Sequence, residues 1–155
     1  MPDSNDTSSV KPGPHRVQLR RSKGWRKPDN TVVVARPSRW GNPFVLGKAQ
    51  VRMPALDGSP WEYEGRLYKT TGERHAFNHD DGHYTWHQVE LATPEQIVEL
   101  FRQTATRANI DTLSGYPRIS EIVSALRGKN LACWCPLDSL CHADVLLELA
   151  NREVQ

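Results

Sequence analysis

Long apolar runs and cysteines are scarce in this sequence, and each shortage excludes a class of protein. None of its 155 residues lies in a run approaching the roughly 20 apolar residues that a membrane-spanning helix needs. Residues 1–14 are polar and rich in Pro, Gly and Ser, so they predict a disordered tail without an apolar signal-peptide core, and we expect a cytoplasmic protein. Three cysteines cannot all pair within one chain, which favours free thiols or metal ligands over a disulfide framework.

The net charge of +2 is unremarkable, but basic residues are concentrated in residues 15–28, which contain no acid. A basic segment with an embedded tryptophan can contact phosphates and stack on a base, which predicts a nucleic-acid-binding arm. The residues of this arm are Arg20, Arg21, Lys23, Trp25 and Arg26. The alternative is an ordered arm in which Trp25 fills a gap in the core while the arginines stay solvated.

A second concentration of polar side chains follows the β-branched run Thr31–Ala35, which predicts a central parallel strand buried on both faces. Guanidinium groups directly after such a strand suit a phosphate, an indole can stack on a flat ring, and glycine lets the backbone approach closely. The alternative is a tight turn with the indole as a core residue. The candidate ligand-binding residues are Arg36, Ser38, Arg39, Trp40, Gly41 and Asn42.

All three cysteines lie near the end of the chain. Residues 129–135 predict a buried strand that ends at Pro136, and residues 144–149 predict a helix packed on it. Cys141 would lie at the start of this helix, where the dipole and free amides stabilise a thiolate, and the adjacent His142 is an acid/base candidate. We favour a structural and binding role, in which Cys133 and Cys135 are small buried apolar residues while His142 and the helix amides face a ligand at the sheet edge.

Zinc is a further alternative, with Cys133, Cys135, Cys141 and His142 as ligands. In an extended strand the first two cysteines would lie about 6.6 Å apart along the chain, too far to share a tetrahedral ion without a bend. The spacing also lacks the usual pair of cysteines separated by two residues. We therefore do not favour zinc, and we expect less than one tightly bound equivalent.

The middle of the chain has a different pattern. Residues 57–91 alternate in polarity around Asp80-Asp81-Gly82, which predicts a β-hairpin inserted between helices. Its four histidines are expected on the hairpin surface rather than around a metal. Thr93, Pro94 and Gln96 predict the start of a helix, and residues 119–126 predict a second amphipathic helix.

Three segments of the chain resemble an uncharacterised family. They are Gly24-Trp25-Arg26 with Pro28, residues 34–44, and residues 131–135 with 141–146. The family is a small domain of unknown function that occurs in actinobacterial, proteobacterial and bacteriophage genomes. The resemblance covers roughly residues 16–151, with a variable middle, and Ala35 stands where we expect a glycine. It implies no established activity.

Together these patterns predict a single α/β domain over residues 15–152, with a short, mainly parallel, Rossmann-like sheet and a β-hairpin insertion. Since ligands bind beyond the carboxyl ends of parallel strands, Arg36 and Arg39 are expected to converge with Cys141 and His142 on one edge. The leading predicted function is binding of a nucleotide or other phosphorylated small molecule, with processing of that molecule as an extension. A nucleic-acid-binding accessory protein and a zinc-stabilised structural module are the alternatives.

Overall fold

The computed structural model describes residues 13–66, 68–106 and 116–152, so most of the predicted disordered tail lies outside the described residues. The chain divides into two compact units. Unit 1 comprises residues 1–42 and 102–155, and unit 2 comprises residues 43–101. Each helix in the described ranges is too short or too polar to cross a membrane.

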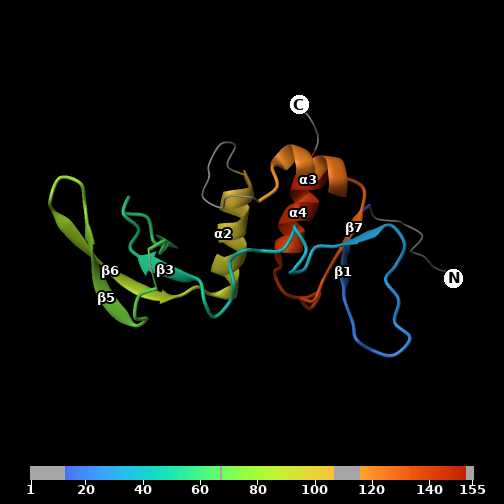
Figure 1. The fold of residues 1–155 in the computed structure, drawn as a ribbon, viewed down its shortest axis with the longest axis horizontal. Coiled ribbons are helices and arrows are strands. Elements are labelled where there is room, and N and C mark those ends of the chain that lie inside the picture. Colours follow the sequence, from blue (N-terminus) through green and yellow to red (C-terminus); the bar gives the residue numbers. More distant parts are fainter. Residues whose placement is uncertain (1–12, 67, 107–115, 153–155) are drawn as a thin grey trace. The chain divides into compact units, whose positions relative to one another are not determined.

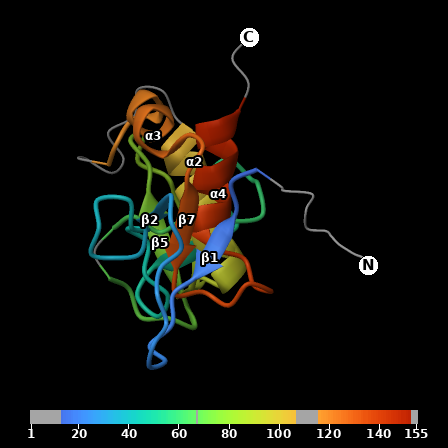
Figure 2. The same cartoon turned by 90° about the vertical axis from the view of Figure 1, so that its right-hand side faces the viewer.

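Unit 1 is built on a sheet of three parallel strands in the order β1-β7-β2 (Figure 2). The strands are β1 (Arg16–Gln18), β7 (Asn130–Cys133) and β2 (Thr31–Val33). Strand β7 is central, with Leu131 and Ala132 fully buried, because it pairs on both sides and is covered by a helix. The prediction that the valine run forms a central strand is wrong. Strand β2 lies at the edge, and all three of its residues are only partly buried.

The helices of unit 1 follow the predicted apolar spacing. Helix α3 (Ile119–Leu126) has the predicted bounds and buries Ile122 and Leu126. Helix α4 (His142–Asn151) buries Val145, Leu146 and Leu149, and it packs against α3 and the sheet (Figures 1 and 2). These elements confirm a mixed α/β fold with a short parallel sheet. The finer Rossmann-like classification stays a prediction.

Unit 2 is built on an antiparallel sheet in the order β4-β3-β6-β5. The strands are β3 (Gln50–Met53), β4 (Glu62–Tyr63), β5 (Glu73–Asn78) and β6 (Tyr84–Leu91). The predicted hairpin joins β5 to β6, and Gly82 at its turn has a φ of 95°, a conformation that glycine adopts without strain. The β-rich part begins at Gln50, ahead of the predicted residues 57–91, because β3 pairs with both β4 and β6.

Helix α2 (Pro94–Thr106) begins with the predicted capping box. The backbone N–H of Gln96 donates to Thr93 Oγ1 at 3.1 Å, and the backbone N–H of Thr93 donates to Gln96 Oε1 at 2.9 Å. These two bonds satisfy amides that have no partner within the helix.

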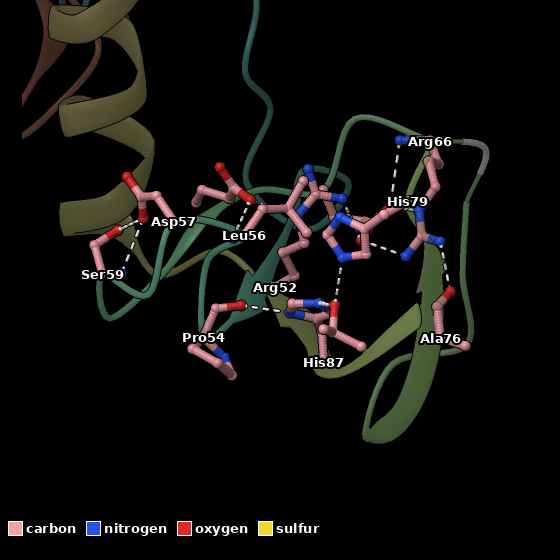
Figure 3. Close-up of polar contacts among 12 residues, drawn as sticks. Arg52, Pro54, Leu56, Asp57, Ser59, Arg66, Ala76, His79 and His87 are labelled. Carbon is pink, nitrogen blue, oxygen red and sulfur yellow. Dashed lines mark hydrogen bonds and ion pairs between the residues drawn. The ribbon is translucent and has the colours of Figure 1, made fainter. Parts of the chain in front are cut away.

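The interior of unit 2 contains a charged network (Figure 3). The fully buried carboxylate of Glu64 accepts from Arg66 Nε at 2.6 Å and from Arg52 Nη1 at 3.3 Å. Burial would raise the pKa of Glu64, but the Arg66 hydrogen bond and the charges of both arginines outweigh burial and lower it. Both guanidinium groups also lie over the ring of Phe77. The carboxylate is therefore part of the structure of this unit.

The histidines of the hairpin take part in hydrogen bonds within unit 2. His87 is buried, with Nδ1 2.6 Å from the Pro54 carbonyl and Nε2 2.5 Å from Thr85 Oγ1 (Figure 3). His79 Nε2 lies 2.9 Å from the same hydroxyl. Among the described residues, the only group placed to hold a metal ion is a cysteine cluster in unit 1.

Candidate metal centre

The three cysteine sulfurs converge just beyond the carboxyl end of β7. The strand ends at Cys133, and the chain bends at Trp134 and Cys135 before Pro136. The sulfurs of Cys133, Cys135 and Cys141 all lie within 4.8 Å of one another, and the first two are 3.9 Å apart. Two thiolates bound at about 2.3 Å to a tetrahedral zinc ion lie about 3.8 Å apart, so this spacing fits.

The geometric objection to zinc raised from the sequence is therefore wrong. It assumed that the strand continues through Cys135, which would separate the sulfurs along an extended chain. The bend at Trp134 removes this separation, and Pro136, which cannot donate to a strand ladder, follows at once.

Arg16 on β1 holds the loop that links the second and third cysteines. Its Nη2 donates to the carbonyls of Pro136, Leu137 and Ser139 at 2.8–2.9 Å, and its Nη1 lies 3.2 Å from Asp144 Oδ2 on α4. Only 7% of this side chain is exposed. A guanidinium presents several donors in a fixed plane, which lets one side chain fix three successive parts of a loop. The loop therefore has a defined path that brings Cys141 back to Cys133.

His142 is buried at the start of α4 and has a defined orientation. Its Nε2 lies 2.9 Å from the carbonyl of Val34, which can only accept, so Nε2 carries the hydrogen. In the neutral imidazole Nδ1 then bears a lone pair. This Nδ1 lies 3.7 Å from Cys141 Sγ, close to the separation of about 3.6 Å expected between nitrogen and sulfur ligands of one zinc ion.

The thiols differ in acidity because they interact with one another. A hydrogen bond from the Cys141 thiol, opposed by burial and helped by His142, lowers the pKa of Cys133 to about 3. Donating that bond, together with burial, raises the pKa of Cys141. Cys141 is also the N-cap of α4, where its sulfur accepts the Ala143 amide at 3.5 Å. The predicted catalytic role of Cys141 and His142 stays a prediction.

The arginine loop after β2 meets this centre through its main chain. The bond from His142 to Val34 joins the two predicted motifs at the carboxyl edge of the parallel sheet. The guanidinium groups are engaged elsewhere. Arg36 Nη1 donates to the Asn42 carbonyl at 2.7 Å, and Arg39 forms an exposed ion pair with Glu121 on α3 at 2.9 Å.

The remaining residues of the loop form a tight turn. Trp40 and Asn42 are buried, and the Ser38 hydroxyl accepts the Trp40 amide at 3.3 Å. A Cβ on Gly41 would lie 2.7 Å from Cγ of Arg36, so glycine is required by the packing of the loop itself. A role for these residues in holding a phosphorylated ligand stays a prediction.

The basic arm lies beside the bend that contains the cysteines. Arg20, Arg21, Lys23 and Arg26 are exposed, and Trp25 is partly buried. The guanidinium of Arg21 lies 4.4 Å from the ring centroid of Trp134, the residue between the first two cysteines. An exposed cation and an exposed indole thus form a pair next to the centre.

Arg16 and Trp134 are the residues that reasoning from the sequence missed. The sequence does not distinguish Arg16 from the other residues of the basic run, because its partners are carbonyls roughly 120 positions away in the sequence. Trp134 was assigned to a buried strand, although Pro136 after the second cysteine was a signal that the strand ends early.

Comparison with known proteins assigns the chain to a family. No curated protein and no solved structure matches it. The model of one family matches residues 17–152. This range includes the cysteine cluster, unit 2 and nearly all of the parallel sheet. The chain therefore belongs to the family described as domain of unknown function DUF4326.

Proposed function

We propose that this domain is a zinc-stabilised module that binds one zinc ion through Cys133, Cys135, Cys141 and Nδ1 of His142. The observation that carries the proposal is the convergence of three sulfurs within 4.8 Å of one another. Thiolates are soft ligands that select zinc among the common divalent ions of cells, and the three residues come from a bend and a helix start that the fold brings together.

The group of atoms within 4.8 Å of one another contains the three sulfurs and not the imidazole, and His142 is proposed as the fourth ligand because its Nδ1 lies 3.7 Å from Cys141 Sγ. A histidine that ligates zinc almost always donates its other ring N–H to a carbonyl or carboxylate, which fixes the tautomer and the plane of the ring. The bond from Nε2 of His142 to the Val34 carbonyl has this form. A site closed by four protein ligands leaves no coordination position for a substrate, so the ion has a structural role.

The expected effect of the ion is to hold three elements of unit 1 together. Cys133 ends the central strand, Cys141 begins α4, and His142 is bonded to the chain leaving β2. The free energy of metal binding adds directly to the free energy of folding, so the ion would stabilise unit 1.

The test is native mass spectrometry of the full chain purified without a chelator, combined with cobalt(II) substitution. We expect one zinc ion per chain, and a cobalt(II) form with sulfur-to-metal charge-transfer bands and the intense visible bands of tetrahedral coordination. Cys133→Ser, Cys135→Ser and Cys141→Ser should each weaken or abolish binding.

His142→Ala tests whether zinc is bound by four protein ligands or by three. We expect the variant to keep the charge-transfer bands, because the thiolates remain, but to bind the ion more weakly and with an altered visible spectrum. His15→Ala is the matched control, because this histidine is exposed and its side chain is not part of the centre. A chain that carries no metal, or a mass lower by a pair of hydrogens from a disulfide within the cluster, would overturn the proposal.

A further inference from the structure

Unit 1 carries an exposed basic surface next to the metal centre, formed by the arm that follows β1. We call Arg20, Arg21, Lys23, Arg26 and Lys27 together with Trp134 the arm surface. All five basic side chains are exposed, and no carboxylate in the described part of the chain forms an ion pair with them. Positive charge without internal partners attracts an anionic ligand.

The two units differ in charge. The residues of unit 1 include 15 Lys and Arg against nine Asp and Glu, a net charge of +6, whereas unit 2 has five against nine, a net charge of −4. The modest overall charge of +2 therefore conceals a strongly basic unit. An anionic partner is attracted to the unit that carries the arm.

The arm surface also contains an aromatic ring in a fixed position. Trp134 is 42% exposed, although it lies between two cysteines that turn into the cluster. The guanidinium of Arg21 lies over its ring at 4.4 Å from the centroid. This contact orients the indole and places a group that can bind phosphate beside it.

We propose that the arm surface binds single-stranded nucleic acid, with a base stacked on Trp134 and the backbone phosphates held by the basic side chains. Proteins that bind single strands combine a basic track with aromatic side chains on which bases stack, and both parts are present here within one surface. A duplex has its bases already stacked and does not offer a free base to the ring. The inference does not depend on the metal, because neither the charge nor the ring is a proposed ligand.

The experiment measures fluorescence anisotropy of labelled oligo(dT) and oligo(rU) of about 12 nucleotides, a length within the usual site size of single-strand binders. The full chain should bind both probes more tightly than a duplex of equal length, and DNA and RNA are compared directly. Trp134→Ala should weaken binding by at least about fivefold, the lower bound for loss of one stacked base. Trp134→Phe should restore most of the affinity.

Charge is tested separately from stacking. Affinity should fall as salt rises, and Arg21→Ala should reduce the slope of log affinity against log salt by about 0.7, the value for one phosphate on a single strand. Trp86→Ala is the matched control. This tryptophan is 49% exposed and lies beside Arg74 at 5.3 Å, but it belongs to the acidic unit 2, so its loss should leave binding unchanged.

Three outcomes would overturn the inference. They are absence of oligonucleotide binding at low salt, binding to duplex as tight as to single strands, and equal losses for Trp86→Ala and Trp134→Ala. Absence of oligonucleotide binding together with binding to vesicles containing phosphatidylserine would instead assign the surface to lipid, since Leu137 and Leu140 are exposed in the same loop. Metal content is measured for every variant, so loss of zinc is distinguished from loss of stacking.

Discussion

Replacement of Arg16 by lysine tests whether the loop between the cysteines determines the metal centre. Lysine keeps the positive charge but presents its donors from a single nitrogen on a flexible stem. It cannot reproduce a planar group that contacts three carbonyls and the carboxylate of Asp144 at once. The substitution therefore removes geometry while preserving charge.

The expected magnitude follows from the contacts of Arg16. Its Nη2 has two hydrogens for the three carbonyls, and a hydrogen bond to a charged group contributes about 1.5–3 kcal/mol. The loop is exposed, so water will compensate for about half of this loss, while the ion pair with the half-exposed Asp144 contributes less than about 1 kcal/mol. We expect Arg16→Lys to cost about 2–3 kcal/mol, equivalent to about a 30- to 150-fold weaker affinity for zinc if the loss falls on binding.

The assay is competition for zinc against a chromophoric chelator of known affinity, performed on the full chain. Arg20→Lys is the matched control, since this arginine is exposed in the same arm and forms no ion pair with any described carboxylate. If Arg16→Lys and Arg20→Lys bind zinc with the same affinity, the loop does not need the guanidinium and the reasoning is refuted. A cobalt(II) spectrum unchanged by Arg16→Lys would lead to the same conclusion about geometry.

Two further predictions concern Glu64 and Gly41. Glu64→Gln should destabilise unit 2 by about 3–5 kcal/mol, because two guanidinium groups lose their carboxylate, and hydrogen exchange of β3 and β6 amides measures this within the unit. The pKa of Glu64 in the folded protein is lowered from 4.5. The stability that its charge contributes is therefore complete above about pH 4.5 and is lost as the pH falls through the pKa of the folded state. The difference in stability between the wild-type protein and Glu64→Gln should thus shrink in acid. Equal protection in both proteins at neutral pH would contradict the prediction. Gly41→Ala should lower the free energy of unfolding by about 1–3 kcal/mol, because the added Cβ would lie 2.7 Å from Arg36. Gly65→Ala is the control and should lower it less, because the nearest atoms to its Cβ are 3.6 Å away. Urea denaturation of the two variants measures the difference.

Elements specified by neighbouring residues could be predicted from the sequence. The capping box of Thr93 and Gln96 forms as expected, since both partners lie within one helical turn. The hairpin turn at Gly82 and the bounds of α3 follow from equally local signals. The order of strand, loop and helix around the cysteines could also be predicted, because these elements succeed one another directly in the chain, whereas a function at this edge stays a prediction.

Features that depend on distant partners could not be predicted in the same way. Strand β1 is only three residues long, and its place beside β7 is specified by pairing across more than 100 positions. The valine run suggested a central strand, but the pairing leaves β2 at the edge while Val34, just beyond it, is fully buried. The ligand geometry was misjudged for a similar reason, since the loop that returns Cys141 to Cys133 is held by Arg16 from the other end of the chain.

The bend at Trp134 connects the metal centre with the arm surface. Cys133 and Cys135 both turn into the cluster at this bend, while Trp134 between them is exposed. Full burial of so large an apolar side chain would stabilise the fold by about 1.5–3 kcal/mol or more, and this stabilisation is only partly realised here. An exposed ring on a flexible loop would lose conformational freedom on binding, which weakens contact with a ligand. The Arg16 guanidinium fixes the loop that follows Trp134, and zinc bound as proposed would also fix the residues on both sides of it, so the same arrangement would preorganise the ring for the proposed stacking.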